Sequence, residues 1–276
     1  MSVAKSLLNK ASGWKTFTNH WFRCHRCLLQ ELFGRHKVKA GSEPLEITFR
    51  NQKIVIAGGA AGAYSYKRYA AGALAAETTI VSDKDDGIVV GIFPIAPLLT
   101  PKQVAKNMYI KFRSPVVMDQ RSDAVVYTKI PIEIGVYRQS EDEELLIDAF
   151  SLSLQRYALY GSPEAGTVCR FFESETSTTE DGICAEKYTE ATVRIRISNA
   201  IDNVVKISKV IVPMDGVVLD HAQDDAWVPG GVDVRLDVAF GKDIVNVRIN
   251  TKVKRADKTS VAKREETLVF MMDAGY

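Results

Sequence analysis

Residues 129–174 read KIPIEIGVYRQSEDEELLIDAFSLSLQRYALYGSPEAGTVCRFFES, and this stretch decides the fold. From residue 126 to residue 137 the side chains alternate in character, which is the period of a half-buried β-strand. One face of this strand carries Val126, Thr128, Ile130, Ile132, Ile134 and Val136, and the other carries Tyr127, Lys129, Glu133 and Tyr137. We therefore expect the three isoleucines to be buried, with Glu133 on the opposite face.

A second strand follows within the same stretch. Phe150, Leu152 and Leu154 share one face, and the run continues to Tyr160. Residues 161–166, GSPEAG, supply turn chemistry before the β-prone residues 167–172, TVCRFF. The pattern predicts a β-hairpin, and we expect Leu152 and Leu154 to be buried. More broadly, residues 45–170 should be mainly antiparallel strands.

Several motifs of the chain resemble the signature of an archaeal family that is known only as a domain of unknown function. The main motifs are PIEIGV at residues 131–136, FSL at 150–152, YALYGSP at 157–163 and GTVCRFF at 166–172. Further similarity lies at residues 64–68, 112–117, 205–210 and 214–216. The resemblance covers most of the chain after residue 40 and implies β structure at 64–68. It brings no established activity, cofactor or site.

The composition is that of a globular protein. The chain has 276 residues, of which 46% are hydrophobic and 25% charged, and this balance excludes general disorder. Residues 1–40 carry a net charge of +7 from eight basic residues and one acidic residue, which leaves −5 for the remainder. Four cysteines are too few for a disulfide scaffold, and no signal peptide or long apolar run appears. We expect a cytoplasmic protein with reduced thiols.

Residues 2–37 are predicted to form a basic amphipathic helical arm. Apolar residues recur at spacings of three, four and seven from Leu7 to Phe33, and Gly34 with His36 suits a helix end. The arm either packs on the chain's own β-body or docks on an anionic membrane surface or a partner protein, and nucleic acid is the least favoured partner. The residues predicted to make the membrane or partner contact are Trp14, Phe17, Trp21, Arg23, Arg26 and Phe33.

The same arm contains metal-ligand types. On a helix, His20, Cys24 and Cys27 lie at i, i+4 and i+7, where they could bind Zn²⁺ with His36 as the fourth ligand. The favoured alternative is that these are ordinary side chains on a helix face, because the second ligand pair of a zinc module is missing. We therefore expect no cofactor, with zinc as an alternative.

A glycine-rich turn gives a second cofactor hypothesis. A strand-like run at residues 53–57 leads into Gly58, Gly59 and Gly62, which resembles the turn that binds FAD or NAD, and Asp83 could bind the ribose. Three observations count against this interpretation. Ala57 occupies the first glycine position, Tyr64 and Tyr66 alternate as in a strand, and no βαβ rhythm follows.

The sequence predicts an all-β fold: an antiparallel β-sandwich-like body behind the helical arm. We expect the arm at residues 1–40, a β-sandwich-like domain at 45–176, and a second β-layer or small β-domain at 190–276. Four arginines on predicted strands could line a polar face for an anion, although outward arginines usually serve solvation and edge protection. They are Arg194, Arg196, Arg235 and Arg248.

No set of catalytic residues emerges from the sequence. His221 is the only histidine outside the arm, and no serine nucleophile motif accompanies it. The favoured function is a non-enzymatic binding or accessory module, and the alternative is a dinucleotide-dependent oxidoreductase that uses the turn at residues 58–62. Arg156, Tyr157, Tyr160 and Arg170 are the candidate binding residues, because aromatic and guanidinium groups gather near the hairpin turn. Their structural alternative is a packed tyrosine and a paired arginine.

Overall fold

The computed structural model describes residues 31–83, 86–101, 105–140, 143–161, 163–164, 166–239, 242–249 and 268–271, with side chains up to residue 237. The chain divides into two units, residues 1–30 and 31–276, and all described residues belong to the second. They form nineteen β-strands and one short 3₁₀ helix, Glu180–Gly182, without an α-helix. The all-β class is therefore confirmed for the described residues.

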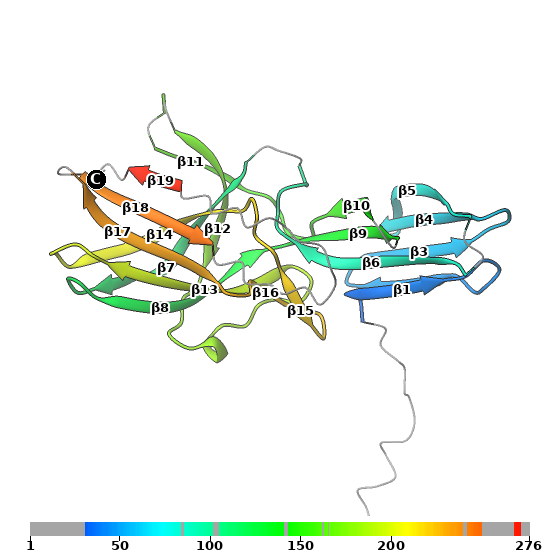
Figure 1. Cartoon of the computed structure of the whole chain (residues 1–276), viewed down its shortest axis with the longest axis horizontal. Helices are drawn as coiled ribbons and strands as arrows, with labels where there is room; N and C mark the ends of the chain where they lie inside the picture. Colours follow the sequence, from blue (N-terminus) through cyan, green and yellow to red (C-terminus); the bar gives the residue numbers. More distant parts are fainter. Residues whose placement is uncertain are drawn as a thin grey trace, which may run out of the picture. The chain divides into compact units, whose positions relative to one another are not determined.

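The strands form four sheets, each named after one of its strands (Figure 1). The β9 sheet has the order β1 (Gly34–Val38), β6 (Ile88–Ile95), β9 (Glu133–Gln139), β10 (Glu144–Phe150). The β3 sheet has the order β2 (Leu45–Phe49), β3 (Gln52–Gly58), β4 (Ala63–Ala70), β5 (Ala73–Val81). The β7 sheet has the order β11 (Tyr157–Tyr160), β12 (Thr167–Ser174), β7 (Asn107–Met118), β14 (Val205–Pro213).

The β13 sheet is the largest of the four. It has the order β15 (Asp220–Ala222), β16 (Asp225–Trp227), β13 (Glu190–Asn199), β17 (Val232–Ala239), β18 (Lys242–Ile249), β19 (Leu268–Met271), and β8 (Asp123–Pro131) also pairs with β13. Most neighbours are antiparallel, and the parallel pairs are β12–β7, β13–β16 and β13–β17. The prediction of mainly antiparallel strands between residues 45 and 170 is confirmed.

The sheets pack in pairs. In the first pair, Phe49 of the β3 sheet lies 6.3 Å from Phe150 of the β9 sheet, measured between ring centroids. In the second pair, Thr128 of the β13 sheet hydrogen-bonds Ser174 of the β7 sheet at 2.8 Å. One contiguous cluster of buried apolar side chains includes residues from all four sheets. One shared core of buried apolar side chains therefore joins the four mostly antiparallel sheets.

The stretch that decides the fold passes from one sheet to another. β8 ends at Pro131 in the β13 sheet, β9 begins at Glu133 in the β9 sheet, and the Ile132 N–H between them donates to the Thr189 carbonyl at 3.0 Å. Ile130, Ile132 and Ile134 are buried as predicted. Glu133, predicted on the polar face, is also fully buried, because both faces of the strand are covered where the chain changes sheet.

The predicted second strand is interrupted. β10 ends at Phe150, and residues 151–156 connect it to β11 in a different sheet. Leu152 is only partly buried and Leu154 is 86% exposed, so the burial predicted for Leu154 is wrong. Leu152 and Leu154 alternate with serines as they would in a strand, but both lie in the connection between β10 and β11.

The predicted helical arm does not extend to residue 37. Residues 34–38 form β1, antiparallel to β6, with Gly34 opposite Ile92 and Val38 opposite Ile88. Pairing with β6 and burial of Val38 override the helical spacing of the preceding residues. The helix prediction is wrong for residues 34–37, and its part before residue 31 lies outside the described residues.

Strands within residues 190–213, inside the predicted second β-layer or small β-domain, pair with strands that precede the predicted boundary. β8 pairs with β13 from Pro131 opposite Glu190 to Asp123 opposite Ser198, and β7 pairs with β14. Strands from both sides of the predicted boundary thus share two sheets. The polar loop between β12 and β13 suggested a boundary, but the sequence does not reveal these long-range pairings.

Candidate functional site

The four candidate binding residues lie at the β11–β12 hairpin but do not form one site. Tyr157 is 39% exposed and lies opposite Arg170, whose side chain is only 1% exposed. Tyr160 is half-buried and contacts Tyr109, with 6.3 Å between the ring centroids. Because alternate residues of a strand point to opposite faces, Tyr160 and Tyr157 point to different sides of the sheet. Arg156, just before β11, is exposed.

Arg170 belongs to a buried polar network. Its Nη1 donates to Gln155 Oε1 at 2.7 Å and to the Thr100 carbonyl at 3.0 Å, and its Nη2 donates to the Pro101 carbonyl at 2.9 Å. Nη1 also lies 3.6 Å from Glu133 Oε1. Its Nε has no hydrogen-bond partner within the part of the chain that is described. The guanidinium therefore holds the loop before β7 against β12.

Glu133 completes this network from the β9 sheet. Its carboxylate accepts hydrogen bonds from the Leu99 N–H at 2.7 Å and the Thr100 N–H at 2.8 Å. Burial is the largest influence on its pKa and raises it, while the two N–H groups and Arg170 act in the opposite direction. Because both charged groups are enclosed, the Glu133–Arg170 pair is a structural joint between the β9 and β7 sheets. Arg170 is thus a buried, paired arginine, which is the alternative to a binding role that the sequence also offered.

A second polar network lies inside the first pair of sheets. The Tyr66 hydroxyl donates to Asp148 Oδ2 at 2.8 Å, Arg68 Nε donates to the same oxygen at 2.7 Å, and the guanidinium lies 4.2 Å from the Phe150 ring centroid. Burial, followed by the Asp148 charge, raises the pKa of Tyr66 far above its ordinary value. This arrangement joins β4 to β10 and keeps the phenol protonated.

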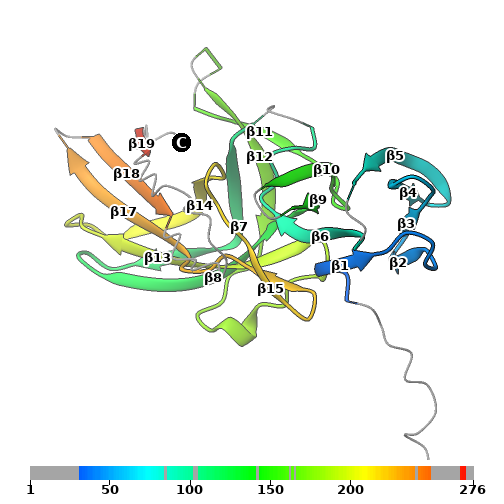
Figure 2. The same ribbon diagram turned by 45° about the vertical axis from the view of Figure 1, so that its right-hand side comes forward.

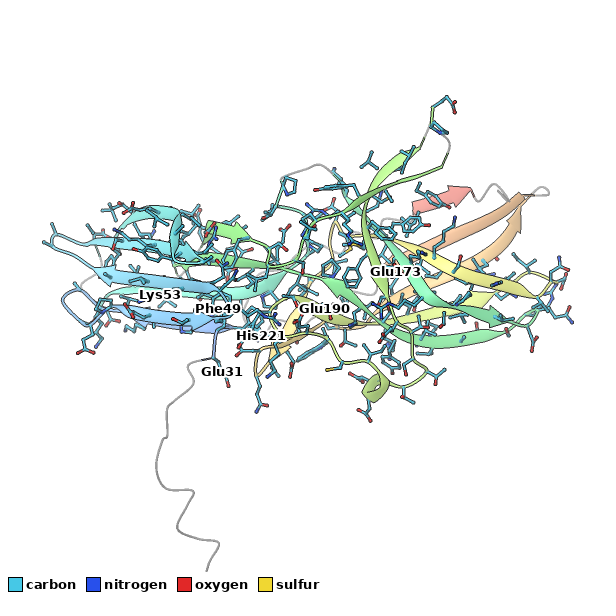
Figure 3. All side chains as sticks on the ribbon, turned by 180° about the vertical axis from the view of Figure 1, so that it is seen from behind. Glu31, Phe49, Lys53, Glu173, Glu190 and His221 are labelled. Atoms are coloured by element: carbon cyan, nitrogen blue, oxygen red, sulfur yellow. The ribbon has the colours of Figure 1, made fainter. Side chains whose placement is uncertain are left out.

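His221 (labelled in Figure 3) belongs to a partly buried aromatic cluster that includes Phe33. The His221 ring stacks between Phe33 at 5.5 Å and Phe93 at 5.8 Å. The Phe33 N–H and the Tyr188 hydroxyl donate to the two oxygens of Asp224, at 3.0 and 2.9 Å. Burial and the Asp224 carboxylate raise the pKa of Tyr188 to about 12. Phe33, which the sequence predicted to contact a membrane or a partner, is buried in the core.

The other arm residues lie outside the described residues: Trp14, Phe17, Trp21, Arg23, Arg26, His20, Cys24 and Cys27. His36 lies in β1, where its Nε2 donates to the Leu32 carbonyl at 3.0 Å. Among the residues with a described position, no group of three or more His, Cys, Asp or Glu could hold a metal ion. The same residues include no helix that is long and apolar enough to cross a membrane.

The glycine-rich turn joins two antiparallel strands. Gly58 ends β3, the Gly59 N–H donates to the Ala63 carbonyl at 2.7 Å, and β4 follows directly. Gly62 has φ +72°, and a Cβ there would lie 2.1 Å from the Ser82 carbonyl oxygen, next to Asp83. The glycines thus permit a tight turn and a close backbone approach. No helix occurs within residues 52–81, so the dinucleotide hypothesis lacks the helix N-terminus that it requires.

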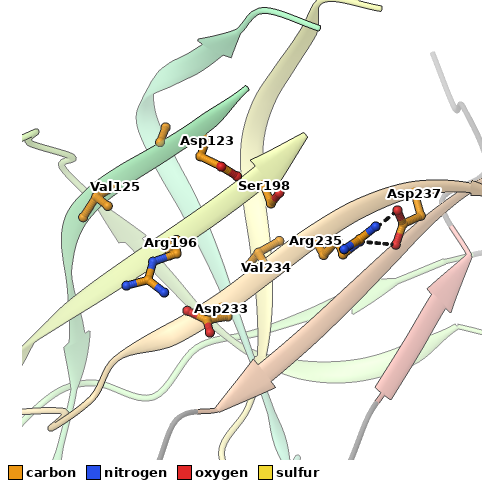
Figure 4. A pocket seen from close by; sticks show the side chains of 9 residues that line it. Asp123, Val125, Arg196, Ser198, Asp233, Val234, Arg235 and Asp237 are labelled. Atoms are coloured by element: carbon orange, nitrogen blue, oxygen red, sulfur yellow. Dashed lines mark hydrogen bonds and ion pairs between the residues drawn. The ribbon is translucent and has the colours of Figure 1, made fainter. Parts of the chain in front are cut away.

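An open groove of about 740 Å³ lies over three neighbouring strands, β8, β13 and β17 (Figure 4). The residues that line it are Asp123, Ala124, Val125, Arg196, Ser198, Asp233, Val234, Arg235 and Asp237. Two of the four arginines that the sequence suggested for a polar face, Arg196 and Arg235, are among them. Arg194 lies further along β13 and donates to the Gly230 carbonyl at 3.0 Å, and the side chain of Arg248 lies outside the description.

The charges in the groove differ in how well they are paired. Arg235 Nε donates to both carboxylate oxygens of Asp237, at 3.0 and 2.8 Å. Within the described part of the chain, neither the Arg196 guanidinium nor the Asp123 carboxylate has a hydrogen bond or an ion pair. Both residues are exposed. The groove therefore offers one cation and one anion that are available to a ligand.

The strand register fixes the spacing of these two charges. Arg196 lies opposite Val125 of β8, and Ser198 lies opposite Asp123. Arg196 and Asp123 are therefore diagonal neighbours on adjacent strands, with roughly 7 to 8 Å between them. Side chains two residues apart on an extended peptide are separated by a similar distance, roughly 6.5 to 7 Å. An extended segment with one acidic and one basic side chain on the same face would match the groove.

The model of the family described as Protein of unknown function (DUF432) matches residues 32–273. The chain belongs to this family. No curated protein and no solved structure matches it. The resemblance inferred from the sequence is confirmed, and the motifs that carried it contribute Glu133 and Arg170 to the joint of this DUF432 protein.

Sequence reasoning missed Asp123 as a groove residue. The signal that could have found it is the alternation at residues 123–128, DAVVYT, which extends the strand predicted from Val126 and places Asp123 on the face of Val125 and Tyr127. The adjacency of β8 and β13, which brings Asp123 near Arg196, depends on long-range pairing. No local pattern in this DUF432 sequence reports that pairing.

Proposed function

We propose that this DUF432 protein is a non-enzymatic binding module that recognises an extended polypeptide segment in the groove over β8, β13 and β17. The observation that carries the proposal is the unpartnered pair of opposite charges, Arg196 and Asp123, on an exposed sheet face within the described part of the chain. A ligand carboxylate would accept hydrogen bonds from the Arg196 guanidinium, and a ligand ammonium group would donate to Asp123. Val125 between them, 39% exposed, offers apolar contact to the segment.

The expected affinity of a short ligand is modest. Charge pairs in contact with solvent contribute about 0.2 to 1 kcal/mol each, because water screens them and both side chains lose conformational freedom. Two such pairs contribute only about 0.4 to 2 kcal/mol together, so an isolated peptide should bind weakly, with a dissociation constant above about 1 mM. A natural partner would add contacts beyond the groove, so the peptide tests the recognition chemistry.

The proposal is tested by NMR titration with an acetylated, amidated peptide, Thr-Glu-Thr-Lys-Thr. Amide shifts should concentrate on β8, β13 and β17, and Arg196→Gln should weaken binding about fivefold, the equivalent of about 1 kcal/mol. Arg113→Gln is the matched control, since Arg113 is exposed on β7 and paired with Glu175. Shifts centred on another surface, or unchanged binding in Arg196→Gln, would contradict the proposal.

We also propose that the first thirty residues bring the protein to an anionic membrane surface, such as the cytoplasmic leaflet. They contain five basic residues and no acidic residue, which leaves −3 for residues 31–276. Near an anionic bilayer each basic residue contributes about 1 kcal/mol of attraction, and Trp14, Phe17 and Trp21 supply interfacial anchors. A protein partner is the competing occupant, and vesicle binding distinguishes the two.

A further inference from the structure

Among the described strands, β11 is an edge strand of the β7 sheet (Figure 2). Among the described strands it pairs only with β12, and the Phe171 N–H donates to the Arg156 carbonyl at 2.8 Å. Backbone groups alternate in direction along an antiparallel pair, so those of Tyr157 and Leu159 face away from β12. Neither has a backbone hydrogen bond among the described residues. The edge therefore offers two N–H groups and two carbonyls to another strand.

The side chains of this edge are uncharged and partly apolar. Residues 157–160 are Tyr, Ala, Leu and Tyr, without the charge or proline that usually protects an edge strand. Leu159 is 47% exposed and lies opposite Val168, which is 46% exposed, on the same face as Tyr157. The outward backbone groups of β11 and the partly exposed side chains of Leu159 and Val168 thus lie next to each other on the protein surface.

The turn end of the hairpin is held in place by contacts on the opposite face. Tyr160 contacts Tyr109, which in turn lies 5.6 Å from Phe171 between ring centroids. Lys209 Nζ lies 5.8 Å from the Tyr160 ring centroid. These contacts fix β11 against the rest of the β7 sheet, so its edge is presented in a defined orientation.

We propose that β11 pairs with β11 of a second copy of this chain, forming a continuous antiparallel sheet across a twofold axis. Such an axis is perpendicular to the sheet and places one residue opposite itself. With Ala158 on the axis, Tyr157 lies opposite Leu159 of the second copy. The outward backbone groups of these two residues then form four hydrogen bonds across the interface, and their side chains pack against each other.

A cation–π contact between the two copies favours this register. With Ala158 on the axis, Arg156 lies opposite Tyr160 of the second copy, on the same face of the sheet. The Arg156 guanidinium has no partner among the described residues, and the face of a tyrosine ring attracts a cation. With Leu159 on the axis, Tyr157 would lie opposite Gly161 and the Arg156 contact would be lost. The second copy is therefore the occupant that the edge fits.

Size-exclusion chromatography with light scattering over a dilution series tests the proposal. The full chain should be a dimer at high concentration, and Leu159→Lys should be monomeric, because it places a charge in the apolar contact of each copy. Leu74→Lys is the matched control: Leu74 is 51% exposed on β5, an edge strand of another sheet, and this variant should dimerise like the unmodified protein. A monomeric unmodified protein, or a dimeric Leu159→Lys, overturns the proposal.

A cross-link tests the register even where Leu159→Lys does not fold. Residues opposite each other in a non-hydrogen-bonded pair have Cα atoms roughly 4.5 Å apart, which a disulfide can span. In a Cys169→Ala background, which removes the thiol opposite residue 158, Ala158→Cys should form a disulfide-linked dimer under oxidation. Cys169→Ala alone reports cross-links through other cysteines. Equal amounts of linked dimer in the two proteins would contradict the proposed pairing.

Discussion

Replacing Glu133 with glutamine should destabilise the body strongly, although the side chain hardly changes in size. Glu133 accepts hydrogen bonds from two backbone N–H groups and faces Arg170 at 3.6 Å. The two N–H groups bond different oxygens of Glu133, and glutamine replaces one of these oxygens with an NH₂ group that cannot accept. The N–H on that side, of Leu99 or Thr100, would face a donor. The charge opposite Arg170 would also be lost.

The magnitude follows from the burial of these groups. A buried N–H left without an acceptor costs about 1 to 3 kcal/mol. Removing one partner of a buried ion pair costs about 3 to 5 kcal/mol, although Arg170 keeps three other acceptors here. Both costs arise from the same carboxylate and are therefore not additive. We expect the free energy of unfolding to fall by about 3 to 5 kcal/mol. A typical free energy of unfolding is about 5 to 15 kcal/mol.

The assay is urea denaturation followed by circular dichroism, with Glu175→Gln as the control. Glu175 pairs with Arg113 at 2.6 Å, but both side chains are 59% exposed, so its loss should cost less than about 1 kcal/mol. The double variant Glu133→Gln with Arg170→Met should lose less stability than the sum of the two single variants. In the double variant both charges are removed, so no buried charge is left without its partner. If Glu133→Gln is as stable as Glu175→Gln, the joint does not hold the sheets together.

Three further predictions concern the joint, the core and the arm. Because burial raises the pKa of Glu133, this carboxyl favours the folded state most below its unfolded pKa of about 4.3 and loses that contribution as the pH rises through its folded pKa. The stability difference between the unmodified protein and Glu133→Gln should therefore narrow as the pH rises from about 4.3 through the folded pKa of Glu133, and a constant difference would contradict the assignment. Ile132→Asp should unfold the body, because it buries a carboxylate in a fully enclosed position, and a near-normal melting temperature would show that Ile132 is not core. Deleting residues 1–30 should leave the body folded and abolish salt-sensitive co-sedimentation with anionic vesicles, whereas vesicle binding that survives the deletion would refute the membrane proposal.

The sequence predicted the β class and much of the core because alternation is a local signal. Ile130, Ile132 and Ile134 lie in or between strands whose burial follows the period of two. The same signal failed at Glu133 and Leu154. Glu133 is enclosed where the chain passes between sheets, and Leu154 lies in a connection, and neither fact is encoded in the spacing of neighbouring residues.

The candidate sites were harder to predict because they depend on long-range pairing. Arg196 could be recognised as an outward arginine, but Asp123 lies far away in the sequence and reaches the same groove only through the β8–β13 register. Arg170 and Tyr160 are close in sequence, yet they point to opposite faces of the β7 sheet and meet different partners. Sequence proximity therefore suggested one site where the structure has two unrelated environments.

Isothermal titration of a charge-reversed groove tests the central claim most directly. The unmodified protein should bind the Thr-Glu-Thr-Lys-Thr peptide more tightly than Thr-Lys-Thr-Lys-Thr, because Arg196 repels a second lysine. In Arg196→Glu an acid replaces the cation beside Asp123, so this preference should reverse, with a change of about fivefold in each affinity. The same order of preference in both proteins would contradict the assignment of the β8–β13–β17 groove as the recognition surface.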